Sequence, residues 1–121
     1  MGKIENIELI RAKNAFEACK DTSISGKAGG EVVKKLPPMI RENGLLGALA
    51  FAIAGENKTI GYKKALDAIA RHLNAREKVE SNDASALLEE LIKADDSLKL
   101  RDATAEAMLY LNYLRRFAKK D

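Results

Sequence analysis

Apolar side chains recur every three or four residues along almost the whole chain, and no stretch sustains the apolar–polar alternation of a half-buried strand. The runs of β-branched and aromatic residues that are typical of strands are missing as well. Two prolines occur, and they are adjacent at positions 37 and 38. Because the spacing is that of amphipathic helices and 121 residues suit one compact unit, we predict an all-α fold: a single-domain bundle of about six helices over residues 1–121.

The first two predicted helices are each marked by a set of apolar residues, and the second contains residues that should break it. The first covers about residues 3–21 and has an apolar face that we expect in the core: Leu9, Ala12, Ala15, Phe16 and Cys19. The second is marked by another set of apolar residues: Val32, Val33, Leu36, Met39 and Ile40. We expect Pro37–Pro38 to interrupt or kink it, because proline removes an amide donor and clashes with the preceding turn. Asn43–Gly44 should end it, since both residues tolerate the left-handed conformation.

A third helix is predicted over about residues 45–54. It is apolar on all sides and rich in glycine and alanine, so we expect it at the centre of the bundle, where small side chains let neighbouring helices approach closely. The stretch has about half the roughly 20 residues needed to span a bilayer. We therefore expect no membrane segment.

The last three predicted helices have simpler apolar faces. The fourth is marked by residues at offsets 0, 4, 7 and 11: Tyr62, Leu66, Ile69 and Leu73. The fifth follows a polar linker, is capped by Ser81, Asn82 or Asp83, and carries its own apolar set: Leu87, Leu88, Leu91 and Ile92. The sixth, after Asp95–Ser97, is the longest and should bury one side: Ala103, Ala107, Tyr110, Leu111, Leu114 and Ala118.

One histidine and one cysteine limit the chemistry of the chain. They cannot form a Cys/His metal site or a disulfide within the chain, so we expect no metal, no cofactor and a cytoplasmic protein. Cys19 lies on the predicted core face and is interpreted as a buried structural thiol. His72 has no second histidine and no acidic partner at helical spacing, so we interpret it as a surface or boundary residue. With no phosphate-binding glycine loop either, the sequence predicts a protein that is not an enzyme.

The net charge of +3 hides an uneven distribution along the chain. Residues 23–43, 57–76 and 98–121 each carry an excess of positive charge, whereas residues 77–97 carry two positive and seven negative side chains. This division predicts a surface with one basic and one acidic region. The acidic segment is either solvated or docked against a basic neighbour.

Helical geometry groups some of the cations on two faces. On the fourth predicted helix, one face opposite the apolar residues holds Lys63, Lys64, Asp67, Arg71 and Asn74. On the last predicted helix, the corresponding face holds Arg101, Asn112, Arg115, Arg116 and Lys119. Such rows of cations without base-reading groups can neutralise backbone phosphates. The alternative is that both faces are merely solvated and that the last cations suit the helix dipole.

Two groups of apolar residues lie either in the core or on a binding surface. Tyr110, Tyr113 and Phe117 have core spacing, so we interpret them as core residues and not as base-stacking groups. Ile7 and Ile10 point away from the predicted core face of the first helix. Either a second helix of the domain or a partner subunit should cover them, which makes both candidate interface residues.

Two segments carry a resemblance to a known family. In residues 33–51, a basic stretch with proline runs through Asn43-Gly44-Leu45 into Leu49-Ala50-Phe51. In residues 105–118, the chain ends on Tyr113-Leu114-Arg115-Arg116-Phe117-Ala118. In this order and separation, the two segments resemble the small helical subunit of the type III-B CRISPR effector, the Cmr complex.

The resemblance implies a non-catalytic, all-α protein that binds other subunits and RNA. Its partners would be the backbone subunit, the large palm-domain subunit, copies of itself, the CRISPR RNA and the target RNA, and its copies would form the minor filament of this antiviral ribonucleoprotein. At the positions that match the two family segments, the resemblance implies RNA contact by five cations: Lys34, Lys35, Arg41, Arg115 and Arg116. The doubled proline at Pro38 departs from the family pattern and should break the helix more firmly. Two other functions stay open, a helix-turn-helix-like DNA-binding regulator and a helical adaptor that binds only protein.

Overall fold

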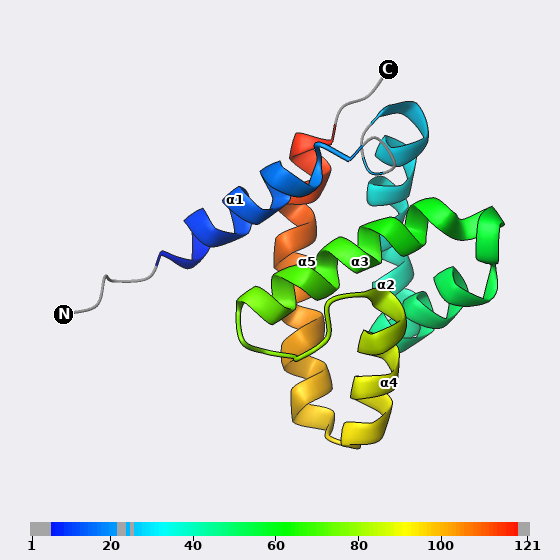
Figure 1. Ribbon diagram of the computed structural model, residues 1–121, viewed down its shortest axis with the longest axis vertical. Helices are drawn as coiled ribbons and strands as arrows, with labels where there is room; N and C mark the ends of the chain where they lie inside the picture. The colour runs from blue at the N-terminus through cyan, green and yellow to red at the C-terminus, as the bar shows by residue number, and fades with distance from the viewer. Residues whose placement is uncertain (1–5, 22–23, 25, 119–121) are drawn as a thin grey trace.

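The computed structural model describes residues 6–21, 24 and 26–118, without the side chains of residues 26–30. Its α-helices form an irregular bundle: α1 (Ile7–Ala18), α2 (Gly26–Ala54), α3 (Ile60–Ala75), α4 (Ala84–Ala94) and α5 (Ser97–Phe117) (Figure 1). A short 3₁₀ helix, η1 (Glu56–Thr59), joins α2 to α3. The described residues include no strand, so the all-α class is confirmed, with five α-helices in place of about six.

The difference in number comes from α2, which contains both the second and the third predicted helix. Gly44 divides it with φ 78° and ψ 166°, a conformation that only glycine adopts without strain, so the predicted break at Asn43–Gly44 is confirmed. The predicted interruption at Pro37–Pro38 is wrong, because both prolines lie in α2 with helical backbone angles. The φ fixed by proline is itself helical, and α2 is further held by packing against α3, α4 and α5.

Helix ends follow the sequence closely. The side chain of Asp83 accepts a hydrogen bond from the amide of Ala86 at 2.8 Å and thereby caps α4, as one of the three predicted candidates. Asp95 closes α4 in the left-handed conformation, with φ 48°. Asp96 then caps α5. The α4–α5 connection is therefore a tight turn between two capped helices.

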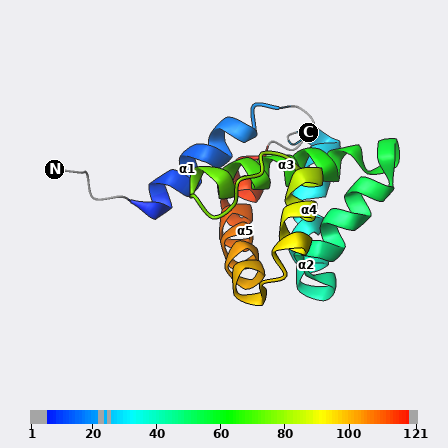
Figure 2. The same cartoon turned by 60° about the horizontal axis from the view of Figure 1, so that its bottom comes forward.

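The central helix of the bundle is α3. It packs against each of the other four α-helices and is buried on most sides (Figures 1 and 2). Its buried residues include the expected Leu66, Ile69 and Leu73. The prediction that residues 45–54 form the centre is wrong: Leu49 on this segment is buried, but Phe51 is 47% exposed. Neighbouring helices cover one side of the segment only, even though both sides are apolar.

The two C-terminal helices follow their predicted apolar faces. All six residues of the predicted α5 face are buried. On α4, Leu87 and Leu91 are buried and Leu88 is partly buried, whereas Ile92 is 57% exposed. A single apolar side on an otherwise polar helix thus gives the orientation of α5 directly from the sequence.

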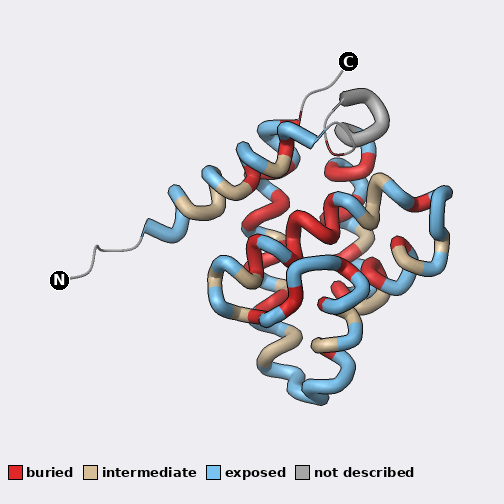
Figure 3. The backbone as a smooth tube through the Cα atoms, in the orientation of Figure 1, coloured by how far each residue is buried: buried red, intermediate tan, exposed pale blue. Residues whose placement is uncertain are grey.

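The first helix lies differently from the prediction. Ala15 and Cys19 are buried as expected, but Leu9 is 64% and Phe16 is 58% exposed, so the predicted core face of α1 is only half correct. Most of the outer side of α1 is open to solvent (Figure 3). The helix spans Ile7–Ala18 within the predicted range of about 3–21, of which residues 3–5 lie outside the described part. Its contacts with the rest of the molecule combine the buried Ala15 and Cys19 with polar side chains such as Arg11 and Asn14.

Candidate nucleic-acid interface

The predicted cations of α2 are on the surface. Lys34, Lys35 and Arg41 are all exposed. Lys35 lies 4.0 Å from the carboxylate of Glu31, and both side chains are at least 60% exposed, so this pair contributes little stability. The N-terminal half of α2, which carries these cations, begins beside the last turns of α5 (Figures 1 and 2).

The cations of α3 divide into two kinds. Lys64 and Arg71 are exposed, but Lys63 is partly buried and its Nζ lies 3.6 Å from the carboxylate of Asp67. Asp67 is itself buried and accepts a hydrogen bond from the amide of Ala84 at 2.7 Å. The predicted open basic face is therefore wrong at Asp67, which ties α3 to the start of α4.

The cations of α5 line its last turns. Arg115 and Arg116 are exposed and make no ion pair with another described residue. Together with Asn112 and Ala118 they line an open hollow at this end of the helix. The predicted residue Lys119 lies outside the described residues.

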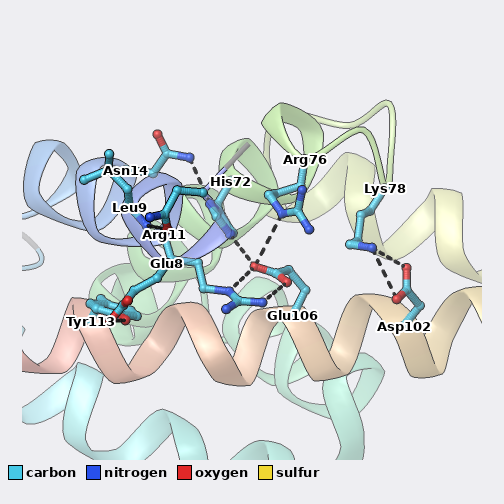
Figure 4. A network of polar contacts seen from close by, with 11 residues as sticks. Glu8, Leu9, Arg11, Asn14, His72, Arg76, Lys78, Asp102, Glu106 and Tyr113 are labelled. Atoms are coloured by element: carbon cyan, nitrogen blue, oxygen red, sulfur yellow. Dashed lines mark hydrogen bonds and ion pairs between the residues drawn. The ribbon is translucent and has the colours of Figure 1, made fainter. Parts of the chain in front are cut away.

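A buried polar cluster, which was not predicted from the sequence, joins α1, α3 and α5. Arg11 donates from Nε and Nη2 to the two carboxylate oxygens of Glu106, at 2.8 and 2.9 Å (Figure 4). Nε2 of His72 lies 2.8 Å from Glu106 Oε2, and Asn14 Nδ2 lies 2.9 Å from His72 Nδ1. Nε of Arg76 approaches the same carboxylate at 3.8 Å. One carboxylate on α5 therefore holds two other helices.

The protonation states of this cluster follow from its contacts. Burial alone would raise the pKa of Glu106, but hydrogen bonds from Arg11 and His72 outweigh it and lower that pKa to about 2. Burial lowers the pKa of His72 below its usual 6.5, against the opposing hydrogen bond to Glu106. Because an ionised carboxylate only accepts, Nε2 of the neutral imidazole carries the proton and Nδ1 accepts from Asn14.

The structure therefore corrects the interpretation of His72, which is buried and not a surface or boundary residue. Its ring stacks on Tyr110, with 4.2 Å between ring centroids and 7° between the planes. Its acidic partner is 34 positions away on another helix, which a search at helical spacing misses. One signal was present in the sequence: Glu106 is a charged residue on the apolar face of α5, three positions after Ala103 and four before Tyr110.

A cavity of about 250 Å³ between α1, α3 and α5 adjoins this cluster, with Asn14, Arg71, His72 and Tyr110 in its lining. Both ring nitrogens of His72 and both oxygens of Glu106 already have partners. The arrangement is therefore suited to holding helices together more than to transferring protons to a ligand. Among the described residues, no group of three or more His, Cys, Asp or Glu side chains could hold a metal ion.

The remaining predicted residues have mixed outcomes. Cys19 is confirmed as a buried thiol, and its Sγ donates to the carbonyl of Leu114 at 3.4 Å. Tyr110 is a core residue as predicted, whereas Tyr113 is only partly buried and Phe117 is 37% exposed. The core prediction therefore fails for Phe117, because it lies at the end of α5, where few neighbours reach it.

The two candidate interface residues of α1 also differ. Ile10 is partly buried, whereas Ile7 is 38% exposed. Neighbouring helices thus leave Ile7 largely open. Contact of either residue with a partner subunit stays a prediction.

The acidic segment 77–97 is partly neutralised within the molecule. Glu90 accepts hydrogen bonds from the amides of Glu80 and Ser81 and pairs with Lys99 at 3.0 Å. Asp95 and Asp96, at the next turn, are exposed. Part of this charge therefore fastens the α3–α4 loop, and part remains at the α4–α5 end of the molecule.

Comparison with known proteins gives one match. A family model described as "CRISPR-associated protein (Cas_Cmr5)" matches residues 7–120. Searches of curated proteins and of solved structures found no match. In the described part of the chain, no helix is long and apolar enough to cross a membrane. The family match covers nearly the whole chain, and the chain therefore belongs to the Cmr5-type small subunits of type III-B CRISPR complexes.

Proposed function

We propose that this protein is a non-catalytic small subunit of a cytoplasmic type III-B effector, where its copies form the minor filament and help to hold target RNA in antiviral defence. Its partners in this proposal are the backbone subunit, the large palm-domain subunit, further copies of itself, and the CRISPR RNA with its target. The family match supports membership of such a complex. Contact with RNA is supported by one observation, the set of exposed cations.

Six predicted RNA-binding cations are exposed and have no ion-pair partner among the described residues: Lys34, Arg41, Lys64, Arg71, Arg115 and Arg116. Cations that are not neutralised within the protein are available to phosphates, and their binding releases counterions from RNA. They come from three helices and have no base-reading pattern. This suits a subunit that accepts any target sequence and leaves recognition to base pairing.

A non-catalytic role is supported by the state of His72 and Glu106. This histidine–carboxylate pair would be the natural candidate for acid–base chemistry, but Glu106 is held by Arg11 and its pKa is lowered to about 2. Both nitrogens of His72 are engaged as well. We therefore assign the pair to holding the fold.

The helix-turn-helix alternative finds no support in the position of α3. In that reading, the segment Leu45–Ala54 and α3 would form the motif, and α3 would enter the major groove. Yet α3 is the most enclosed helix of the bundle, with Ala65–Ala70 all buried. A protein-only adaptor remains the competing function that an experiment must separate.

The test is a salt titration of binding to single-stranded RNA. We expect the double variant Arg115→Glu/Arg116→Glu to bind more weakly and to show a shallower dependence of log K on log salt. Each lost phosphate contact on a single strand should reduce the slope by about 0.7. Circular dichroism checks that the helices are retained.

Two controls define the outcome. Arg115→Lys/Arg116→Lys keeps both charges and should keep the slope, and Lys93→Glu reverses an exposed charge of the acidic segment and should have little effect. No RNA binding by the wild-type protein even at low salt would favour the adaptor. Preference for one duplex DNA sequence would contradict the CRISPR proposal.

A further inference from the structure

An exposed aromatic pair lies where the end of α1 meets the end of α5. Phe16 is 58% exposed, Phe117 is 37% exposed, and their ring centroids are 5.9 Å apart at an interplanar angle of 87°. Tyr113 lies one turn earlier on α5, and its ring centroid is 6.3 Å from that of Phe117. An edge-to-face contact buries only part of each ring, and the exposed fractions show that aromatic surface of both residues remains open to solvent.

The surroundings of this pair are cationic. Nζ of Lys20 lies 5.8 Å from the centroid of Phe16 and is only loosely held by Glu17, at 3.2 Å with both side chains more than 60% exposed. Arg115 and Arg116 directly precede Phe117, and both are exposed. Lys20 therefore approaches the aromatic pair from α1, and Arg115 and Arg116 add positive charge to the end of α5.

This combination selects one kind of ligand. A basic surface attracts a polyanion, and open aromatic faces next to it offer stacking to flat, unpaired bases. An apolar protein segment would pack against the rings but would form no ion pairs with the cations. Duplex RNA would pair its phosphates with the cations but would not stack on the rings, because its bases are already stacked on one another.

We propose that Phe16 and Phe117 form a stacking site for an unpaired base of single-stranded RNA, whose phosphates contact Lys20 and Arg116. This proposal rests on the proposed function of holding RNA and adds how the strand is held. Stacking is tolerant of sequence, since every base has a flat face. The site would therefore position a strand without reading it.

The experiment uses Phe16→Trp, since the sequence has no tryptophan and the new indole can be excited selectively at wavelengths where tyrosine does not absorb. Titration with a single-stranded oligouridylate should quench its fluorescence, because a stacked base lies against the ring. Phe16→Leu should weaken binding of the same oligonucleotide by about tenfold, with the salt slope unchanged because no cation is removed.

The matched control is Leu9, which is 64% exposed and two helical turns earlier on the same face of α1. Leu9→Trp should show little quenching and Leu9→Ala little change in affinity. If RNA binds to Phe16→Trp without quenching and Phe16→Leu keeps full affinity, stacking is overturned while RNA binding stands. If wild-type protein binds no RNA, the proposed function itself fails. If Phe16→Leu spares RNA but weakens assembly with other subunits, the pair is a protein contact and the stacking site is wrong.

Discussion

Two apolar segments of this molecule, α1 and the Leu45–Ala54 half of α2, are attached to the bundle by different chemistry. The segment of α2 buries Leu45, Ala48, Leu49 and Ala52 against its neighbours. In contrast, α1 turns Leu9 outward and adds charged and polar contacts to the buried Ala15 and Cys19. The first junction depends mainly on apolar area, whereas the second also depends on ionised groups, so mutation and pH should affect them unequally.

The largest effect is expected at the apolar junction. Leu49→Ala removes a fully buried side chain, and we expect the free energy of unfolding to fall by about 3 kcal/mol from lost burial and the cavity left behind. Urea unfolding followed by circular dichroism measures it. Leu46→Ala, at a partly buried position on the same segment, serves as control and should cost clearly less. Equal losses in both variants would contradict the inner and outer sides assigned to this segment.

A smaller loss is expected at the polar junction. Glu106→Gln keeps the shape but removes the charge that pairs with Arg11, and we expect a loss of about 2 kcal/mol, since Arg11 is partly open to water. The control is Glu8→Gln at the same α1–α5 junction, where Glu8 accepts an exposed hydrogen bond from Tyr113 at 3.1 Å. Urea unfolding of Glu8→Gln should give nearly the wild-type value. If both variants behave alike, Glu106 is not the residue that holds α1.

The smallest effect is a dependence on pH between pH 7 and 5, to which His72 in the polar junction contributes. Because the pKa of His72 is lowered in the fold, the unfolded chain takes up its proton first, and stability should fall as pH drops below 6.5. Glu106 adds a further loss between about pH 4.5 and about 2, where the unfolded carboxylate is protonated and the folded one is not. Urea unfolding at several pH values measures both.

His72→Phe isolates the first of these losses, since it keeps a ring against Tyr110 and has no titrating group. Its stability should change less than that of the wild type between pH 7 and 5, while Leu49→Ala should keep the wild-type dependence. Parallel curves for His72→Phe and the wild type would show that His72 does not take part in the pH response.

The sequence was most informative where one physical signal decided the outcome. On α5, a single apolar side predicted all of the buried apolar residues, though not the buried Glu106, and capping residues such as Asp83 marked helix ends. Charged residues on amphipathic helices were correctly expected on the surface, as Arg115 shows. These are local signals, and they survive folding because no long-range partner competes with them.

Predictions failed where a contact with a residue far away in the sequence determined which side chains are buried. Hydrophobicity favoured burying Leu9 and Phe16, but the contact of Arg11 with Glu106, 95 positions away, contributes to the orientation of α1. Asp67 was placed on an open face because its partner, the amide of Ala84, belongs to another helix. Helical spacing within one segment carries no information about such pairs.

The connection of α1 to α5 also bears on the order in which the chain folds. Residues that lie next to each other in the fold, such as Arg11 and Glu106, are 95 positions apart in the sequence, so closing that loop is costly in entropy. During synthesis, α1 leaves the ribosome before α5 does. Because its partners lie on α5, α1 docks only after α5 has been made.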